Sequence, residues 1–366
     1  MKQLIYIIPL FTILVTSCTN KTNTPQCIIE ESNIENYGTD KLSNTFSNIE
    51  FITLETNDDC LLGEIDVIKK RNGKYYIQSG RNALHVFDEK GNFIQKVGKL
   101  GEGPGEYPIL SDFEADNKAI YLLSMQKLYV YNLDGQFQKV INLEENTRTI
   151  KRIPNGFLAF LSSAQGEDCL AYYNDEGNIL KTALPKNNSL RLVRKVPWTE
   201  KGNGFYIFQK TQSNDLVCFD NNQKAFYQIH AMNDENAISF DELEQIEDPS
   251  QTSKILLDGF TNSQSQLMFA GMKQGNITIY VHDKEKAKNH AINLKDIKDD
   301  ITFTNYKFIQ TMGKCDSDDK DMLAFIETNV LKEAIEEKGI HEESAYKSLI
   351  NTNDEHNPTI IAFKFK

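Results

Sequence analysis

The sequence has few of the residues that build catalytic and metal centres. Its 366 residues include six histidines, six cysteines and one tryptophan. It contains no C-x-x-C, H-E-x-x-H or G-x-S-x-G motif, and so lacks the short signatures of zinc sites, zinc proteases and α/β-hydrolases. The cysteines are irregularly spaced, which indicates buried apolar residues and not a disulfide framework. A single bridge between Cys27 and Cys60 is the alternative.

Positive charge is also scarce. Lysine and arginine number 40 against 52 aspartates and glutamates, which gives a net charge of -12 at pH 7. A field of this sign repels phosphate. We therefore expect no nucleic acid among the main partners.

The apolar run at the N-terminus is too short to cross a membrane. It extends from Leu4 to Val15 and contains Pro9, whereas a spanning helix needs about 20 apolar residues. Lys2 precedes it and small residues follow it, which is the plan of a secretory signal peptide. We predict that residues 1–17 form such a peptide.

The stretch "VTSC" at residues 15–18 resembles the lipobox of bacterial lipoproteins, in which the cysteine is acylated and becomes the new N-terminus. This resemblance makes residues 1–17 a lipoprotein signal peptide and Cys18 the lipidation site, with a membrane as partner through the lipid. Thr19 to Gln26 are polar and lack hydrophobic periodicity, so residues 18–45 are predicted to be a lipid-anchored tether. An acidic cluster directly after the lipidated cysteine would resemble the surface-export signal of Bacteroidetes lipoproteins. None follows Cys18, which favours an outer-membrane protein of the cell envelope that faces the periplasm.

What the sequence does have is an internal repeat. Each copy reads as a strand, a turn and a second strand, with aromatic or β-branched residues before the turn and Asp, Asn or Gly in it. The copies are "HVFDEKGNF" (85–93), "YVYNLDGQF" (129–137), "AYYNDEGNI" (171–179), "VCFDNNQKA" (217–225) and "IYVHDKEKA" (279–287). Successive copies lie 42 to 46 residues apart, except for a last interval of 62. The acidic segment 233–250 reads as the insertion that lengthens this interval.

A period in the low to middle forties, with about four strands per unit, is typical of a β-propeller blade. One blade cannot bury both of its faces, so the blades must close into a ring. The alternating strand at 357–366 and the unpaired strand at 48–56 are predicted to share the last blade. We therefore predict an all-β, six-bladed β-propeller over residues 46–366, with seven blades as the alternative if 233–266 hides another.

One segment before the C-terminal strand is predicted to be helical. Residues 328–350 place Leu331, Ala334 and Ile335 at helical spacing, with a break at Lys338-Gly339. We expect this short helical insertion to pack on the rim of the ring. A helix that binds a partner is the alternative.

The region 72–143, with its hairpin "VFDEKGNF" and the segment "GKLGEGPGEYP", resembles NHL-type propeller repeats. It resembles more closely the 6-bladed β-propeller lipoproteins of Bacteroidetes. The VTSC stretch, the helix and the terminal "NPTIIAFKF" are similar to that family as well. The resemblance implies a fold and a location in the cell envelope, and no reaction.

The glycine-rich stretch "GKLGEGPGEY" (98–107) does not match a phosphate-binding loop. It lacks Gly-Lys-Ser/Thr and a following helix, and Glu102 and Glu106 would repel phosphate. We predict an architectural loop between two blades, because glycine permits unusual backbone angles and proline stiffens the path. Ligand contact at a funnel mouth is the alternative, and it involves Gly101, Gly103, Pro104, Gly105, Glu106 and Tyr107.

Two further groups of residues are candidate sites. Asp316, Asp318 and Asp319 belong to a carboxylate-rich run that fails the EF-hand pattern, so a solvated loop is predicted and Ca²⁺ bound in another geometry is the alternative. Trp198 lies near Arg194, and an exposed tryptophan among cations would suit contact with a sugar or a peptide. Core packing is predicted for Trp198, and the ligand contact with Arg194 is the alternative.

Taken together, the sequence predicts a cell-envelope binding or interaction module with a protein or glycan ligand. No cofactor is assigned apart from the possible Ca²⁺. A metal-dependent hydrolase or lyase that acts on envelope or dietary carbohydrate, or on a lactone, is one alternative. A structural subunit of an envelope complex is another. The sequence favours a protein that is not an enzyme.

Overall fold

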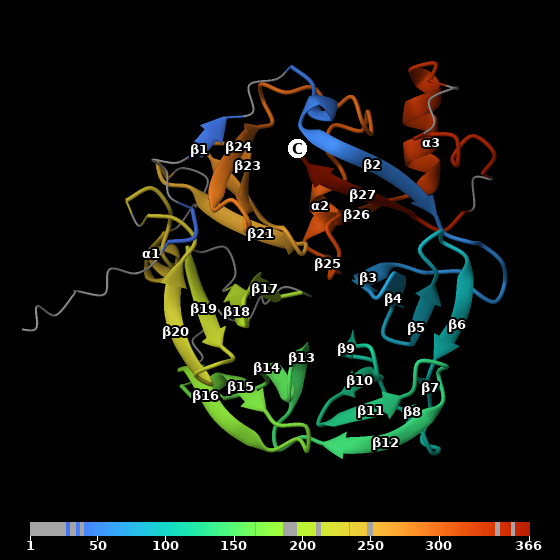
Figure 1. Cartoon of the computed structure of the whole chain (residues 1–366), viewed down its shortest axis with the longest axis vertical. Helices are drawn as coiled ribbons and strands as arrows, with labels where there is room; N and C mark the ends of the chain where they lie inside the picture. The colour runs from blue at the N-terminus through green and yellow to red at the C-terminus, as the bar shows by residue number, and fades with distance from the viewer. Residues whose placement is uncertain are drawn as a thin grey trace, which may run out of the picture.

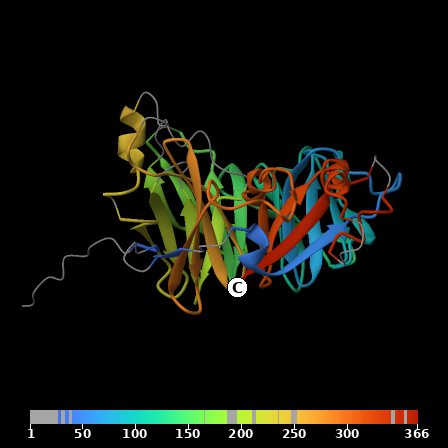
Figure 2. The ribbon, with the colours of Figure 1, turned by 90° about the horizontal axis from the view of Figure 1, so that it is seen from above.

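The chain folds into a ring of six β-sheets around one axis, as in a propeller (Figure 1). The computed structural model describes residues 27–29, 34–36, 40–164, 166–185, 196–209, 214–233, 235–246, 252–340, 345–352 and 356–366. Seen from above, the strands run roughly along the axis of the ring (Figure 2). The predicted six-bladed β-propeller is confirmed.

Blades I to V each contain four consecutive antiparallel strands, ordered from the axis to the rim. Blade I is β3 (Ile65–Arg71), β4 (Lys74–Ser79), β5 (Ala83–Phe87) and β6 (Phe93–Val97). Blade II is β9 (Asp112–Ala115), β10 (Ile120–Ser124), β11 (Lys127–Tyr131) and β12 (Phe137–Asn142). Blade III is β13 (Thr147–Ile153), β14 (Gly156–Leu161), β15 (Asp168–Tyr173) and β16 (Ile179–Pro185).

Blade IV is β17 (Trp198–Gly202), β18 (Phe205–Gln209), β19 (Asp215–Asp220) and β20 (Ala225–His230). Blade V is β21 (Leu256–Asn262), β22 (Gln266–Lys273), β23 (Asn276–Asp283) and β24 (Lys288–Asn293). The five repeat copies found in the sequence all fall on the third and fourth strands of their blades. The acidic segment before blade V contains the short helix α1 (Phe240–Gln245) and lies between β20 and β21.

The turns of the repeat are held by the first polar side chain of each turn. In blade I, the carboxylate of Asp88 accepts hydrogen bonds from the backbone N–H groups of Lys90 and Asn92, both at 2.8 Å. Gly91 has a φ of 88°, a left-handed angle that glycine adopts without a steric penalty. The Asp-x-x-Gly-Asn sequence therefore folds locally into the turn that joins β5 to β6.

Blade VI is built from both ends of the chain, as predicted. It contains β26 (Met322–Ile326), β27 (Thr359–Phe365) and the N-terminal strand β2 (Phe46–Thr53) at the rim. β2 pairs with β27 in antiparallel register, with Phe51 opposite Ile361. The rings of Phe46 and Phe363 lie 4.6 Å apart and help to bury this blade. The ring is thus closed by hydrogen bonds and apolar packing, without a covalent link.

The predicted tether is shorter than expected. The N–H of Ile28 donates to the carbonyl of His230 at 3.1 Å, and that of Ile29 to the carbonyl of Ala231 at 2.8 Å. Strand β1 (Ile34–Asn36) then pairs in parallel with β24. The prediction of a free tether over residues 18–45 is therefore wrong for the described residues from Cys27 onward. The physical reason is that Ile28 and Ile29 are apolar and are buried against blades IV and V.

The helical insertion is confirmed but is shorter than the predicted range. α3 (Thr328–Glu337) precedes β27 and packs Leu331 and Ile335 into the core of blade VI. Residues 345–350 form turns, and their Tyr346 is buried and stacks on Phe51 at 5.1 Å. A second short helix, α2 (Ile309–Met312), lies beside β26.

The described cysteines form no disulfide, so the alternative of a Cys27–Cys60 bridge is wrong. Cys27 lies at the rim of blade IV, whereas Cys60 is buried beside blades I and VI. In the described part of the chain, no helix has the length and apolar character needed to cross a membrane. The signal peptide and Cys18 lie outside the described residues.

Candidate functional site

A cavity of about 310 Å³ opens on the axis, where the innermost strands of the blades end. β3, β9 and β13 reach it with their last residues, and β17 and β25 (Cys315–Ser317) complete its wall. β25 crosses from blade VI and pairs in parallel with β3. The lining residues are Arg71, Asn72, Glu114, Ala115, Asp116, Asn117, Lys151, Arg152, Glu200, Ser317 and Asp318.

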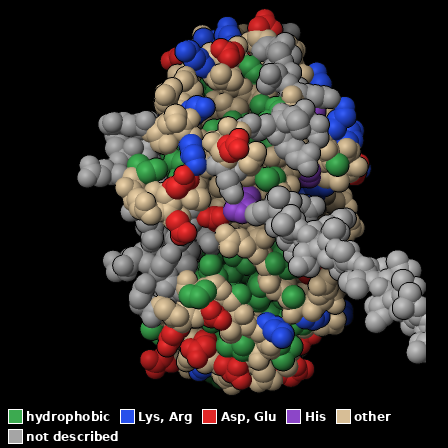
Figure 3. Space-filling view, turned by 90° about the vertical axis from the view of Figure 1, so that its left-hand side faces the viewer, with side chains coloured by type: hydrophobic (Ala, Val, Ile, Leu, Met, Phe, Trp, Pro, Cys, Tyr) green, Lys and Arg blue, Asp and Glu red, His purple; other side chains and the backbone are tan. Residues whose placement is uncertain are grey.

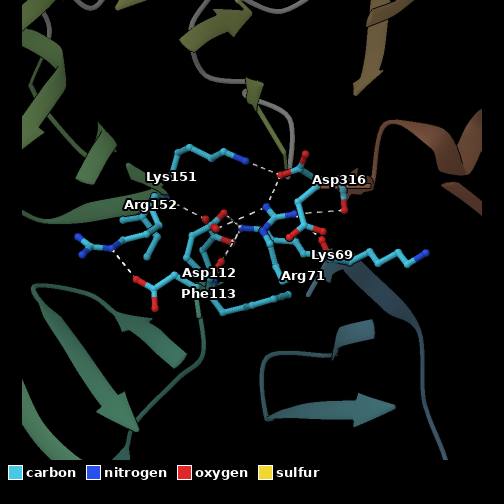
Figure 4. A network of polar contacts seen from close by, with 12 residues as sticks. Lys69, Arg71, Asp112, Phe113, Lys151, Arg152 and Asp316 are labelled. Carbon is cyan, nitrogen blue, oxygen red and sulfur yellow. Dashed lines mark hydrogen bonds and ion pairs between the residues drawn. The ribbon is translucent and has the colours of Figure 1, made fainter. Parts of the chain in front are cut away.

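Beneath the cavity lies a buried network of alternating charges (Figure 4). Lys69 is 2% exposed, and its ammonium contacts Asp112 Oδ1 at 3.0 Å, Glu114 Oε1 at 2.9 Å and the carbonyl of Phe113 at 2.5 Å. Its three N–H bonds thus meet three acceptors. The second oxygen of Asp112 accepts the backbone N–H of Ile150 at 2.8 Å, which links blade II to blade III.

Asp316 is the second centre of this network. Its Oδ2 lies 2.5 Å from Arg71 Nη2 and 2.7 Å from Lys151 Nζ. Arg71 also approaches Glu114 at 3.5 Å, so the network is continuous from Asp112 to Lys151. Three cations and three anions balance each other. Because paired charges are the form in which charge is tolerated in a protein interior, the network joins blades I, II and III and β25 at the axis.

The network favours the ionised forms of Lys69, Glu114 and Asp316, whereas burial raises the pKa of Asp112 above its usual value. Burial acts to raise the pKa of Asp316, but the attraction of Arg71 and Lys151 outweighs it and holds this pKa well below its usual range. Glu114 follows the same pattern, because Lys69 and Arg71 lower its pKa more than burial raises it. For Lys69, burial acts to lower the pKa, but Asp112 and Glu114 raise it above the usual value. Fixed charges of this kind bind and orient polar groups, and they are not poised to exchange protons near neutral pH.

Arg152 forms the wall of the cavity on the side of blade III. Its guanidinium contacts Asp116 at 3.1 Å and Asp175 at 2.5 Å, and it stacks over the rings of Tyr121 and Phe157. This packing fixes the planar group in one orientation. Glu200 on β17 and Asp318 after β25 are more exposed and stand at the mouth.

The glycine-rich stretch lies at the opposite end of the blades. It connects β6 to β9 and contains the short parallel pair β7 (Lys99–Leu100) and β8 (Glu106–Tyr107). The carboxylate of Glu106 pairs with Lys99 at 2.6 Å and accepts the N–H of Gly103 at 3.0 Å. Since this stretch precedes β9 and the cavity lies where β9 ends, Gly101, Gly103, Pro104, Gly105, Glu106 and Tyr107 do not line the cavity.

Trp198 is a core residue and not an exposed ligand contact. It is 1% exposed, begins β17 and packs against Phe208 at 5.0 Å between blades III and IV. The predicted core packing of Trp198 is therefore confirmed, and the alternative of an exposed ligand contact is wrong, because Trp198 lies in the inner strand of blade IV. Arg194 lies outside the described residues.

The three candidate calcium ligands do not converge on one point. Asp316 is neutralised by Arg71 and Lys151, and Asp319 pairs with Lys70 at 2.8 Å. Asp318 accepts the backbone N–H of Asn72 at 3.0 Å and faces the cavity mouth. Within the part of the chain that the structure describes, no three or more His, Cys, Asp or Glu side chains are grouped so as to hold a metal ion.

The network itself could not be predicted from the sequence. Lys69 and Arg71 lie in "IDVIKKR", Glu114 in "DFEA" and Lys151 in "TRTIKRI". Each lies in the innermost strand of its blade and is buried. One signal is present in the sequence, namely charged residues in the first strand of blades I, II and III, among apolar neighbours. It does not reveal the partners of these charges, because the ion pairs join residues up to 245 positions apart.

Comparisons with known proteins concern the fold. A family described as Domain of unknown function (DUF4934) matches residues 25–364. No curated protein matches the chain. A Bacteroides fragilis protein described as exported has a similar structure, with a TM-score of 0.71 and 18% identity over 91% of this chain and 99% of its own. U3-55K matches 89% of this chain and 100% of its own at 7% identity and a TM-score of 0.46. The WD40 domain of Neurospora crassa Pan2 matches 68% and 71% at 11% identity and a TM-score of 0.39.

Proposed function

Since the chain belongs to the family described as Domain of unknown function (DUF4934), we propose a function from the axial cavity itself: the propeller is a binding module that holds a hydroxyl-rich ligand, such as the end of a glycan chain. The observation that carries this proposal is the convergence of fixed polar groups from four blades on one cavity. Small-molecule sites have this character, with a concave wall and a few convergent polar groups.

The chemistry of the wall supports a hydroxyl-rich ligand. A hydroxyl both donates and accepts hydrogen bonds, and the wall offers both kinds of partner. Lys151 and Arg152 present N–H donors, while Glu200 and Asp318 present carboxylate acceptors. Among the described residues, one oxygen of Asp316 is the hydrogen-bond partner of the Lys151 ammonium, so further N–H bonds are available to a ligand. A cavity of about 310 Å³ is at the lower end of the range for ligand sites.

A binding role also agrees with the electrostatics. Beside the cavity, Glu114 and Asp316 are held ionised and Lys69 is held protonated. An acid–base catalyst needs a group whose pKa lies near the working pH. The described network instead supplies permanent charges, which orient a ligand without a proton transfer.

The test of this proposal is a ligand screen with matched variants. Isothermal calorimetry of the mature chain against mono- and oligosaccharides of envelope and dietary glycans should identify a ligand. The double variant Glu200→Gln, Asp318→Asn should then weaken binding by about tenfold or more, because it removes two charged acceptors from the mouth. Glu102→Gln, in the loop at the other end of the blades, is the control. Equal affinity of the double variant and the control would place the ligand elsewhere.

We also propose that the module is an envelope lipoprotein, anchored through acylated Cys18 in the outer membrane and facing the periplasm. The VTSC stretch after a signal-like segment supports this. Metabolic labelling with an alkyne fatty acid should mark the protein, and Cys18→Ser should abolish the label. Cys27→Ser, a matched substitution nine positions further along, should keep it. A label that survives Cys18→Ser would contradict the anchor.

A further inference from the structure

An exposed apolar surface lies on the outer strands of blades III and IV. We call it the β16–β20 rim, after the two neighbouring strands that form it. Leu180 is 50% exposed and Tyr227 is 37% exposed. Four further apolar side chains of these strands are half-buried and pack against the clusters between the blades, namely Ile179, Ala183, Leu184 and Phe226. The two strands contain one lysine and no acidic residue. Figure 3 shows hydrophobic side chains gathered in the lower half of this side of the molecule.

The N-terminal chain joins the ring at the same rim. Cys27 pairs in parallel with His230, the last residue of β20. Nine peptide units separate Cys27 from Cys18, and an extended chain covers at most about 3.6 Å per residue. Cys18 therefore stays within about 30 Å of the rim.

We propose that the β16–β20 rim docks on the lipid bilayer that holds the acyl chains of Cys18, an inference that rests on the lipid anchor proposed above. Docking on the rim lays the axis of the ring along the membrane plane. Both ends of the axis then face water, and the axial cavity stays open to its ligand.

The chemistry of the rim suits the interface of a bilayer more than an anionic surface. Tyrosine is enriched where membranes meet water, because its ring is apolar and its hydroxyl is polar. The net charge of -12 repels anionic headgroups, so the contact is apolar and insensitive to salt. A weak contact suffices, because a short tether keeps the rim at a high effective concentration near the surface.

A second apolar rim provides the matched control. Ile94 on β6 and Val140 on β12 are also exposed, at 42% and 37%, on blades I and II. This rim lies across the ring from the point where the N-terminal chain joins (Figure 1). Ile94 and Leu180 occupy equivalent positions, each three residues after the turn glycine of its repeat. The β16–β20 rim therefore lies beside the point where the tether joins the ring, and the second rim does not.

The test uses tryptophan as a depth reporter at these two positions. The mature chain, Thr19 to Lys366, carries an N-terminal hexahistidine and is bound to phosphatidylcholine vesicles that contain a nickel-chelating lipid and brominated acyl chains. Leu180→Trp should lose about half or more of its added emission, because a docked apolar surface enters the headgroup boundary by about 5–10 Å. Ile94→Trp should lose none. Trp198 is buried and common to both variants, so it sets the baseline.

The possible outcomes are distinct. Equal quenching of the two variants, or quenching of neither, would overturn rim docking. A blue shift of Leu180→Trp emission that grows with protein concentration without vesicles would also overturn it, because the rim would then bind a second copy of the chain. The hexahistidine replaces the natural lipid, so this result does not depend on acylation. Loss of the lipid anchor in the labelling experiment and loss of rim docking are therefore separate findings.

Discussion

The axis of the propeller and the spaces between its blades are held together by different kinds of contact. At the axis, buried charges alternate between Lys69, Glu114, Arg71 and Asp316. Farther out, each pair of neighbouring blades shares an apolar cluster, such as the one that contains Ile361 and Phe363. Apolar packing is non-directional and tolerant of small shifts, whereas ion pairs in a protein interior depend on geometry and on every partner being present.

This difference explains why the cavity lies where it does. The cavity opens at the axis, so the buried polar groups beside it need hydrogen-bond or ionic partners. The charged network supplies these partners and at the same time ties β25 to blades I and III. We infer that the axis combines a structural role with a binding role, while the outer contacts are structural.

The largest effect should come from breaking the network at its centre. Asp316→Ala leaves Arg71 and Lys151 buried without their shared counter-charge. Removal of one partner from a buried pair lowers the free energy of unfolding by about 3–5 kcal/mol. Urea denaturation, followed by circular dichroism, measures this loss of unfolding free energy. Adding Lys151→Met should restore part of the loss, because one uncompensated charge is removed.

Asp318→Asn is the control for this experiment. Asp318 stands two residues further along the chain but is exposed, so we expect the free energy of unfolding to change by no more than about 0.5 kcal/mol. Equal losses for Asp316→Ala and Asp318→Asn would show that the network does not hold the axis.

A slightly smaller effect is expected from the apolar closure of the ring. Ile361 on β27 is 1% exposed and lies opposite Phe51 of β2. Ile361→Ala should lower the free energy of unfolding by about 2–5 kcal/mol, through lost burial and a residual cavity. Lys364→Ala on the same strand is the control. If the two losses are alike, the pairing of the chain ends is not what closes the ring.

The fold could be predicted because its signals are local and repeated. The turn residues Asp88, Gly91 and Asn92 specify one hairpin, and the same pattern recurs at about forty-residue intervals. The alternation of Ile361, Phe363 and Phe365 marked a half-buried strand, and it pairs with β2 as expected.

The site could not be predicted because its contacts are not local. Nothing near Lys69 in the sequence indicates Asp112, and nothing near Arg71 indicates Asp316. Charges in a strand usually face water, so the charged residues of the three innermost strands do not by themselves indicate a buried network. The tether was predicted to be too long because this contact is not local either: Ile28 and Ile29 are buried by residues of blades IV and V.

A fall in pH should weaken the charged network at the axis but not the apolar contacts between the blades. Asp316 and Glu114 have a pKa in the folded protein below the values of about 3.9 and 4.3 in unfolded chains. Their contribution is therefore complete above pH 5 and is lost as the pH falls towards the folded values. Asp112 acts in the opposite direction, because burial raises its pKa in the folded protein, so we expect the free energy of unfolding to fall by no more than about 2–3 kcal/mol between pH 7 and pH 3.

Two variants sharpen this acid experiment. Asp316→Asn should flatten the dependence of the unfolding free energy on pH, because the amide does not titrate. Ile361→Ala should lower the whole curve and leave its slope unchanged. A curve of Asp316→Asn as steep as that of the parent protein would assign acid sensitivity to carboxylates outside the network.

The smallest effect separates two glycines at equivalent turns of the repeat. Gly177 of blade III has a φ of 92°, and a Cβ there would lie 2.1 Å from the carbonyl oxygen of Asn142 in blade II. Gly135 has a φ of 76°, but its Cβ would meet Oε1 of Gln95, the end of a flexible side chain, at 2.6 Å. Both alanine variants strain the backbone, so the difference between them reports the contact between blades. Gly177→Ala should lower the free energy of unfolding by about 1–2 kcal/mol more than Gly135→Ala. Thermal unfolding of the two proteins measures this difference. Equal midpoints would mean that the backbone contact between blades II and III rearranges at no greater cost than the flexible side chain of Gln95.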